Sequence, residues 1–391
     1  MKNPETSNTE KTVVFAGGGT GGHLFPALAI AERLVGGGRG VRCVFACSQR
    51  PLDAEILKKE TLNGAPVEFV PIRAQPFGVR PKALWRFVSN WGGSVAESRA
   101  VLQEASRRGP VVVVAMGGFV AAPMVQAARV EKVRTLMVNL DGVPGKSNRW
   151  AAKHVEQVLT AAAIDPSLGY GHWKQIPPIV RRAAVAPASA AECRKRLGLD
   201  PQRPVLLITG GSQGAGSINL FMRKFVEVHA EMMRAGGWQV LHQTGGVSRD
   251  GSDPVREMEV AYAAAGIEAV VRPFVQGFGE WWGAAELAMS RSGAGSVAEV
   301  WANGVPTVFL PYPYHKDQHQ KKNAEGLVAA GAAVLAEDAV SVEANMRVLG
   351  PVVAGLMGDA GKRGEIREKL KGIGPANGAE QAGEVVEGLL A

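Results

Sequence analysis

Short runs of apolar, mostly β-branched residues alternate along the chain with segments whose apolar residues recur at helical spacing. In the first half, strand-like runs lie at 11–17, 41–47, 110–116 and 134–140, and a helix-like segment follows each of them. This alternation predicts βαβ units around a parallel sheet. We therefore expect an α/β fold.

The same pattern begins again in the second half. A strand-like run at 204–209 leads into a glycine-rich loop and a helix-like segment, and further strand-like runs lie at 238–245, 268–274, 285–290 and 306–313. Each half thus has its own glycine turn after its own first strand, which predicts two Rossmann-like domains.

The expected domain boundaries follow from a segment at 175–190 that is rich in proline and alanine and has no clear period. We interpret it as the linker. The expected domains are 1–178 and 179–370, and 371–391 is expected to form a C-terminal helix that docks back on the first domain.

Composition narrows the class of protein. With 391 residues, 46% hydrophobic and 20% charged, the chain is typical of a globular protein of two domains. The net charge of +8 favours an anionic partner, which could be phosphate, nucleic acid or a membrane surface. Cys43, Cys47 and Cys193 form no CxxC and are expected to be reduced and buried. The first ten residues are polar, so no secretion signal is expected.

Two glycine-rich loops, GGGTGGH at 17–23 and GGSQGAG at 210–216, each stand between a strand and a helix. Glycine lets a ligand approach the backbone closely, and the N–H groups at a helix N-terminus bind anions. Each loop alone is equally consistent with a phosphate site and with a tight turn that binds nothing.

Three familiar motifs were compared with these loops. A dinucleotide site needs an acid at the end of the second strand, but that strand ends in VFACSQR, which disfavours NAD. A P-loop would need glycine at Leu140. GGSQG does fit the nucleophile elbow of a serine hydrolase, with Ser212 as nucleophile and with Asp317 and His319 following in the required order. A hydrolase would leave the first glycine loop unexplained, but it stays an alternative.

GGGTGGH, GGFVAAP, GGSQGAGSIN and SRSGAGSVAEVWANGVPTVFLPYPYHKDQHQKKN occur in this order along nearly the whole chain. Together they resemble the MurG family of UDP-N-acetylglucosamine:undecaprenyl-pyrophosphoryl-muramoyl-pentapeptide N-acetylglucosaminyltransferases. The resemblance implies a GT-B fold, with two Rossmann-like domains facing across a cleft. It also implies inverting transfer of N-acetylglucosamine to the 4-hydroxyl of the lipid-linked muramoyl-pentapeptide, which forms lipid II in peptidoglycan synthesis.

The resemblance further implies UDP-N-acetylglucosamine as substrate, no tightly bound cofactor, no metal and no nucleic-acid partner. No DxD motif is present, and helix N-termini and basic groups can stabilise a leaving diphosphate. Glu299 is expected to bind the ribose hydroxyls, Ser212 and Gln213 the diphosphate, and Gln320 and Asn323 the sugar. The full expected donor-binding set is Thr20, Gly21, Gly22, Asn148, Arg181, Ser212, Gln213, Gly214, Ala294, Gly295, Ser296, Glu299, His319, Gln320 and Asn323.

The expected acceptor-binding residues are Gly18, Gly19, Gly117, Gly118 and Phe119. The chain departs from the family pattern on this side. Val138, Asn139, Leu140 and Asp141 stand where most members have His-Glu-Gln-Asn, and Phe119 replaces the usual tyrosine. Either the acceptor contacts are rewired or the acceptor differs.

The sugar hydroxyl is a poor nucleophile, so a general base is expected. His23 is the first candidate because imidazole titrates near neutral pH, and Asp141 is the second. His23 could instead donate a hydrogen bond to a phosphate, and the base could be neither residue.

A lipid-linked acceptor requires contact with a membrane. Residues 69–96 contain four cations and no acid, and Leu84, Phe87, Val88 and Trp91 recur at helical spacing. We expect a peripheral association with the cytoplasmic face of the anionic inner membrane; the alternative is a helix packed on the core. The expected contact residues are Arg80, Lys82, Leu84, Trp85, Phe87, Val88 and Trp91.

Two further alternatives remain. The chain could be another GT-B enzyme that uses UDP-N-acetylglucosamine, either an epimerase or a transferase with a different acceptor. It could also be a nucleotide-binding scaffold that has lost catalysis, because the acceptor loop is altered.

Overall fold

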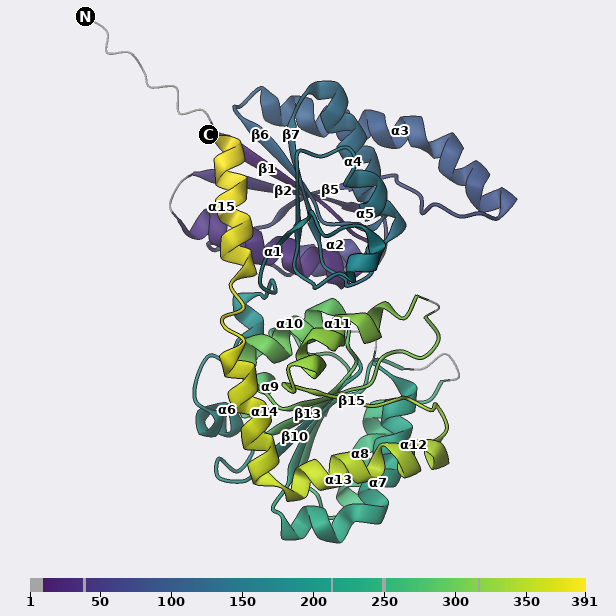
Figure 1. Cartoon of the computed structure of the whole chain (residues 1–391), viewed down its shortest axis with the longest axis vertical. Coiled ribbons are helices and arrows are strands. Elements are labelled where there is room, and N and C mark those ends of the chain that lie inside the picture. Colours follow the sequence, from purple (N-terminus) through teal and green to yellow (C-terminus); the bar gives the residue numbers. More distant parts are fainter. Residues whose placement is uncertain (1–9, 38–39, 212–213, 248–250, 316) are drawn as a thin grey trace, which may run out of the picture. The chain divides into compact units, whose positions relative to one another are not determined.

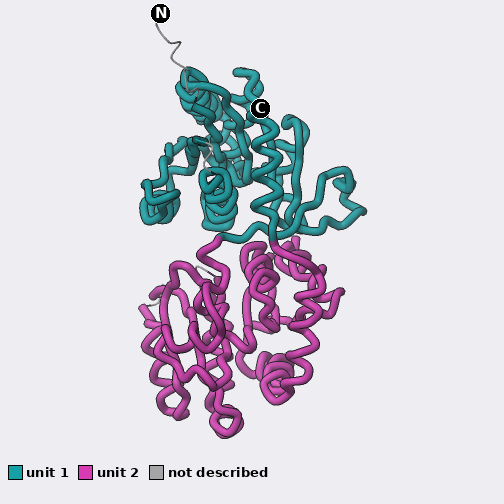
Figure 2. The backbone as a smooth tube through the Cα atoms, turned by 90° about the vertical axis from the view of Figure 1, so that its left-hand side faces the viewer, with its two compact units in different colours: residues 1–181, 377–391 teal, residues 182–376 magenta. Residues whose placement is uncertain are grey.

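The computed structural model describes residues 10–391 except 38–39, 212–213, 248–250 and 316. The chain forms two compact units, which Figure 2 shows in different colours. The first contains the residues up to Arg181 together with Asn377–Ala391, and the second contains Arg182–Ala376.

The first unit is built on a seven-stranded parallel sheet in the order β5-β2-β1-β6-β7-β8-β9. The strands are β1 (Lys11–Ala16), β2 (Val41–Ser48), β5 (Glu68–Ile72), β6 (Val111–Ala115), β7 (Arg134–Asn139), β8 (Gln157–Thr160) and β9 (Lys174–Gln175). The strand order reverses between β1 and β6, and open α/β sheets bind ligands at the carboxyl ends of strands at such a point.

Helices cover both faces of this sheet, so its central strands are buried (Figure 1). The helices are α1 (Gly21–Gly36), α2 (Pro51–Lys58), α3 (Pro81–Ser106), α4 (Gly118–Glu131), α5 (Lys146–Ala151) and α15 (Gly378–Leu390); β3 (Thr61–Leu62) and β4 (Ala65–Pro66) form a small hairpin.

The second unit repeats this architecture with a six-stranded parallel sheet in the order β12-β11-β10-β13-β14-β15. Its strands are β10 (Val205–Thr209), β11 (Gln239–Gln243), β12 (Ala269–Arg272), β13 (Leu287–Ser290), β14 (Thr307–Phe309) and β15 (Val334–Leu335). Its helices are α6 (Ala190–Arg196), α7 (Gly216–Ala235), α8 (Pro254–Ala264), α9 (Gly279–Ala284), α10 (Ala294–Asn303), α11 (His319–Ala329), α12 (Val342–Val348), α13 (Gly350–Gly358) and α14 (Ala360–Gly372). The expected α/β class with two parallel-sheet units is confirmed.

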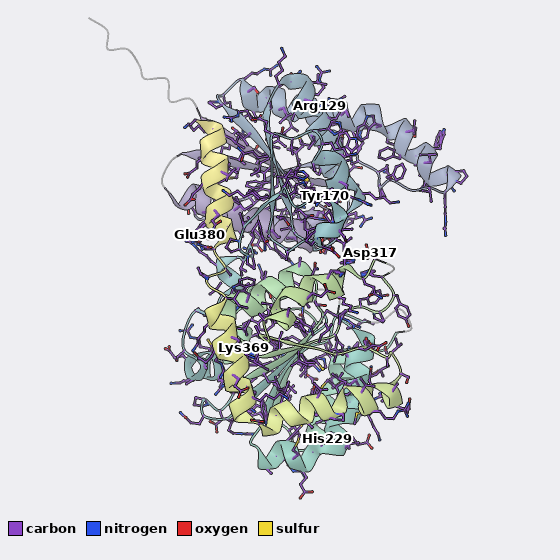
Figure 3. All side chains as sticks on the ribbon, in the orientation of Figure 1. Arg129, Tyr170, His229, Asp317, Lys369 and Glu380 are labelled. Atoms are coloured by element: carbon purple, nitrogen blue, oxygen red, sulfur yellow. The ribbon has the colours of Figure 1, made fainter. Side chains whose placement is uncertain are left out.

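The C-terminal segment crosses from the second unit to the first. The indole Nε1 of Trp301 donates to the carbonyl of Gly374 at 2.7 Å, which holds the residues after α14 in the second unit. The division therefore falls at 376/377, later than the expected 370/371. Helix α15 then packs on α1, where Glu380, labelled in Figure 3, forms a 2.6 Å ion pair with Arg33.

Candidate active site

The first glycine loop connects β1 to α1 and is held by a buried carboxylate. Asp53, in the first turn of α2, accepts hydrogen bonds from the Gly19 N–H at 2.8 and 3.1 Å, the Ser48 N–H at 2.9 Å and the Ser48 hydroxyl at 2.6 Å. A Cβ at Gly18 would collide with this carboxylate, so the close approach requires glycine. Asp53 was not among the expected site residues, because no local signal in the sequence distinguishes it from a solvated acid at the start of a helix.

Phe119, expected to bind the acceptor, lies against the same loop. A Cβ at Gly19 would be 2.8 Å from the Phe119 ring. The guanidinium of Arg50 lies over this ring, 5.1 Å from its centroid, and Nη1 donates to the carbonyl of Gly19 at 3.0 Å. Arg50 therefore places an exposed positive charge beside the loop.

His23, in the first turn of α1, is half-buried between the two glycine segments. Its Nδ1 is 3.4 Å from the Thr20 hydroxyl, and a Cβ at Gly117 or Gly118 would lie 3.1 to 3.3 Å from its ring nitrogens. Burial lowers the pKa of His23 below its ordinary value of 6.5, although the negative charge of Asp141 acts in the opposite direction. The ring is consequently neutral at pH 7.

The four residues that depart from the family pattern divide into two groups. Val138 and Leu140 are buried apolar residues, and Asn139 is a buried polar one. Asn139 donates to the Asp141 carbonyl at 2.7 Å and to Thr160 Oγ1 at 3.1 Å, and it accepts from Asn148 Nδ2 at 3.1 Å. These three residues are therefore part of the interior of the loop. Asp141 is the charged residue among the four, and its negative charge acts on His23.

Asn148, expected to bind the donor, belongs to this same network. Its Oδ1 would lie 2.9 Å from a Cβ at Gly117. Thr20, Gly21 and Gly22 are the N-cap and the first two residues of α1. The expected residues Gly18, Gly19, Gly117, Gly118, Phe119 and His23 thus come together at the carboxyl ends of β1 and β6.

Arg181, expected to bind the donor, is paired with two carboxylates of the first unit. Its guanidinium donates to Glu32 at 3.1 and 3.3 Å and to Glu60 at 2.7 and 2.9 Å, all within the first unit. Two carboxylates already compensate the charge and occupy Nε and both Nη atoms. In this structure Arg181 is an ion-pair residue of the first unit, and its expected role at the donor pyrophosphate stays a prediction.

In the second unit, the corresponding glycine loop connects β10 to α7. Ser212 and Gln213, the expected diphosphate ligands, lie outside the described residues. Gly214 has φ +72°, and a Cβ there would collide with the carbonyl of Thr244 at the end of β11. The backbone at Gly214, two residues before the start of α7, is therefore packed tightly against the residues that follow β11.

Glu299 lies on α10, whose first three residues are Ala294, Gly295 and Ser296. Its carboxylate Oε2 accepts a 2.8 Å hydrogen bond from the indole Nε1 of Trp282, a fully buried residue of α9. The N–H groups of the first turn of α10 have no partner within the helix and can bind an anion. The carboxylate of Glu299 can accept hydrogen bonds from ribose hydroxyls, and the N-terminus of the same helix can bind a diphosphate.

Helix α11 carries the expected sugar-binding residues. Gln320 accepts a hydrogen bond from the Tyr312 N–H at 2.9 Å, and Asn323 donates to the Ser292 carbonyl at 3.3 Å. His319 Nδ1 is 2.9 Å from Asp317, labelled in Figure 3, and its ring stacks on His315 at 4.3 Å. Burial acts to raise the pKa of Asp317, but the hydrogen bonds from His319 outweigh it, and the pKa lies below the usual range.

Across the part of the chain that the structure describes, no group of three or more His, Cys, Asp or Glu side chains is placed to hold a metal ion.

The N-terminal half of α3 is the segment expected to meet the membrane. Trp85 is 71% exposed and Val88 63%, and Leu84 is also exposed. Phe87 and Trp91 instead belong to an aromatic cluster with Phe77 and Trp150, with centroid separations of 5.3 to 6.1 Å. Of the expected membrane-contact residues, Leu84, Trp85 and Val88 are thus exposed, whereas Phe87 and Trp91 pack in the aromatic cluster. The buried residues of α3 begin at Ser94, so its first half extends beyond the sheet (Figure 1).

The two units correspond to two family models. Residues 13–160 match the glycosyltransferase family 28 N-terminal domain, and residues 205–346 match its C-terminal domain. A protein of Desulforudis audaxviator named "UDP-N-acetylglucosamine--N-acetylmuramyl-(pentapeptide) pyrophosphoryl-undecaprenol N-acetylglucosamine transferase" is 32% identical over 388 residues, covering 96% of this chain and 98% of the relative. A protein of the same name from Halorhodospira halophila is 32% identical over 378 residues, with the same coverage.

Solved structures share the fold. The crystal structure of Acinetobacter baumannii MurG matches with a TM-score of 0.69 at 21% identity, covering 97% of this chain and 99% of that one. A UDP-glucosyltransferase from Polygonum tinctorium matches with a TM-score of 0.65 at 14% identity, covering 98% and 99%. Two α/β units, each built on a parallel sheet and matching one of the two domains of glycosyltransferase family 28, define a glycosyltransferase of the GT-B class. The chain belongs to the MurG family.

Proposed function

We propose that this protein transfers N-acetylglucosamine from UDP-N-acetylglucosamine to the 4-hydroxyl of the undecaprenyl-linked muramoyl-pentapeptide, which completes lipid II for peptidoglycan synthesis. The observation that carries the proposal is the 32% identity to transferases of that name over almost the whole of both chains. The alternatives, an epimerase, a transferase with another acceptor, a scaffold without catalysis and a hydrolase using Ser212, have no comparable support.

The donor is bound by the second unit in this proposal. Glu299, oriented by Trp282, accepts hydrogen bonds from the two ribose hydroxyls. The N-termini of α7 and α10 receive the diphosphate, together with Ser212, Gln213 and Gly214. Gln320 and Asn323 on α11 contact the sugar hydroxyls, with His319 beside them.

The acceptor is bound by the two glycine segments of the first unit, Gly18–Gly19 and Gly117–Gly118, with Phe119. The 4-hydroxyl oxygen forms a bond to the anomeric carbon on the face opposite the diphosphate. The bond from that carbon to the diphosphate oxygen breaks, UDP leaves, and the configuration inverts.

The proton of the 4-hydroxyl passes to His23 in the first version of this mechanism. The ring is neutral at pH 7 because burial lowers its pKa, so it can accept a proton. The negative charge of Asp141 then stabilises the imidazolium. In the second version Asp141 takes the proton and His23 donates a hydrogen bond to a phosphate. A third possibility is that neither residue is the base.

Membrane contact is proposed through the first half of α3 and the two residues before it, which we call the α3 patch: Val79, Arg80, Lys82, Leu84, Trp85, Arg86 and Val88. Exposed apolar side chains interleaved with three cations suit the interface of an anionic leaflet. Phe87 and Trp91 support the patch through the aromatic cluster. Among the described residues, no helix combines the length and hydrophobicity needed to cross a bilayer. The proposed location is the cytoplasmic face of the inner membrane.

The test is a transfer assay with radiolabelled UDP-N-acetylglucosamine and defined lipid I analogues. We expect label in the lipid product and release of one UDP for each sugar transferred, both dependent on the acceptor. Epimerisation of the donor without an acceptor would replace this proposal by the epimerase, and transfer to another acceptor alone would overturn the lipid I assignment. Labelling of Ser212 by an organophosphonate would favour the hydrolase.

A further inference from the structure

Arg291, directly after β13, is 6% exposed and was not among the expected site residues. Its Nη2 donates to Asp338 Oδ2 at 2.7 Å and to Ser217 Oγ at 2.9 Å. Its Nη1 donates to the carbonyls of Leu310 and Pro311 at 3.0 and 3.2 Å, and the guanidinium lies over the Tyr312 ring, 5.7 Å from its centroid. One side chain thus joins four segments of the second unit.

Asp338, which follows β15, completes this arrangement. It is 3% exposed and accepts further hydrogen bonds from Ser217 Oγ at 2.6 Å, Asn345 Nδ2 at 3.0 Å and the Val340 N–H at 2.9 Å. Burial acts to raise the pKa of Asp338, but these hydrogen bonds and the charge of Arg291 outweigh it and lower the pKa. Asp338 is therefore ionised at neutral pH, and both side chains of the ion pair have several hydrogen-bond partners.

The joined segments are the ones to which donor binding was assigned. Ser217 is the second residue of α7, at the end of the second glycine loop. Arg291 immediately precedes Ser292, whose carbonyl is bonded to Asn323, and leads into α10 with Glu299. Tyr312, which follows Pro311, donates its N–H to Gln320. The expected diphosphate, ribose and sugar residues thus lie on segments that the ion pair contacts or that a hydrogen bond joins to such a segment.

A second buried arginine in the same unit provides a reference. Arg363 on α14 is 7% exposed, donates to the carbonyls of Leu356 and Met357 at 2.6 and 2.9 Å, pairs with Glu286 at 3.4 Å, and lies over Trp238, 5.2 Å from its centroid. It has the same kinds of partner as Arg291. Its partners, however, lie on α13 and in the segments before β13 and β11, and none of them is an expected donor residue.

We propose that Arg291 and Asp338 are positioning residues for the nucleotide-sugar: their buried ion pair sets the spacing of the α7 N-terminus, the α10 loop and α11. The inference rests on the proposed function, since it takes a UDP-sugar as the ligand of these three elements. A buried ion pair adds little net stability compared with apolar packing of the same volume. Its clearer consequence is to hold loops from different strands in one arrangement before the ligand binds.

The experiment compares R291K, D338N and S217A with the matched variant R363K, all in the full-length chain. Lysine keeps the charge but cannot reproduce the bidentate and carbonyl contacts of arginine. We expect R291K and D338N to raise the Kd for UDP and the KM for UDP-N-acetylglucosamine by about tenfold or more, with the acceptor KM unchanged. S217A, which removes one hydroxyl, should raise the Kd for UDP and the KM for UDP-N-acetylglucosamine by about threefold. R363K should lower the melting temperature and leave the UDP Kd within about twofold of the wild type.

Several outcomes overturn the proposal. If R291K and R363K change UDP affinity equally, the ion pair is only structural. If R291K does not fold, S217A decides, and an unchanged UDP Kd in S217A and D338N counts against positioning. Calorimetric measurement of UDP binding also distinguishes a failure of the proposed function from a failure of the positioning role. A wild-type protein that binds no UDP overturns the proposed function itself, whereas UDP binding that is unaffected by R291K overturns this proposal alone.

Discussion

The indole N–H of Trp282 donates a 2.8 Å hydrogen bond to the carboxylate of Glu299. Trp282 is fully buried on α9, and Glu299 is half-buried on α10. A rigid aromatic donor therefore fixes the orientation of the carboxylate that we assign to the ribose. A hydrogen bond to a charged group contributes about 1.5–3 kcal/mol, enough to matter for affinity.

The first prediction concerns this bond. Trp282→Phe removes the donor and leaves a smaller aromatic ring, so the KM for UDP-N-acetylglucosamine should rise by about tenfold. Steady-state kinetics at saturating acceptor measures it. Trp281→Phe is the matched control, because Trp281 is a buried neighbour on the same helix that contacts Phe278. Equal donor KM values for the two variants would show that the bond to Glu299 has no role in binding.

The second prediction concerns the general base. If His23 accepts the proton, kcat/KM should fall on the acid side at a pKa below 6.5, because burial lowers the pKa of the ring. Asp141→Asn removes an anion that raises this pKa, so the acid limb should move to lower pH while activity at pH 8 changes little.

The pH profile also separates the rival mechanisms. If Asp141 is the base, Asp141→Asn should instead lower kcat by about 10²-fold or more at every pH. His23→Ala should have that effect if His23 is the base. If both variants keep their turnover, the base is neither residue.

The third prediction concerns the first glycine loop. Asp53→Asn replaces one carboxylate oxygen by an NH₂ group that cannot accept the hydrogen bonds of Gly19 and Ser48. The free energy of unfolding should fall by about 1–3 kcal/mol. The melting temperature of a unit this size should fall by about 2–4 °C for each kcal/mol. Calorimetry measures it, with the exposed Glu55→Gln on the same helix as control. A melting temperature equal to that of the control would contradict the role given to Asp53.

The fourth prediction concerns the α3 patch. Val88→Glu places a negative charge among exposed apolar and basic side chains, and binding to vesicles of anionic phospholipid should weaken by about tenfold or more. Co-sedimentation with vesicles measures the partition coefficient. Val228→Glu is the matched control, because Val228 is a 55% exposed valine on α7 and its substitution changes the net charge by the same amount. If both variants lose binding to the same extent, net charge and not the patch attracts the protein.

Much of the architecture was predictable because it depends on local patterns. Strand-like runs, helical periodicity and glycine turns are properties of neighbouring residues, so β1, α1, β10 and α7 and the two parallel sheets were expected from sequence. The place of Glu299 on the helix that directly follows a glycine turn was expected for the same reason, and its role at the ribose stays a prediction.

The residues that hold the loops were not predictable in this way. Asp53 reaches Gly19 across a separation of 34 residues, and Asp338 reaches Ser217 across 121. Nothing in the local pattern around Asp53 or Asp338 distinguishes them from solvated acids on a helix or loop. The pairing of Arg181 with Glu32 and Glu60 was likewise not predictable, because these partners lie 149 and 121 residues away in the sequence.

The sequence by itself determined the class of fold, the order of the elements and the short segments where glycine permits close approach of a ligand. The tertiary structure decided which charges are compensated inside the protein and which are directed to the site: Arg291 and Asp338 neutralise each other, and Asp141 acts on His23. The physical reason is that backbone preferences act between neighbours, whereas burial and electrostatic pairing depend on distances that only folding establishes.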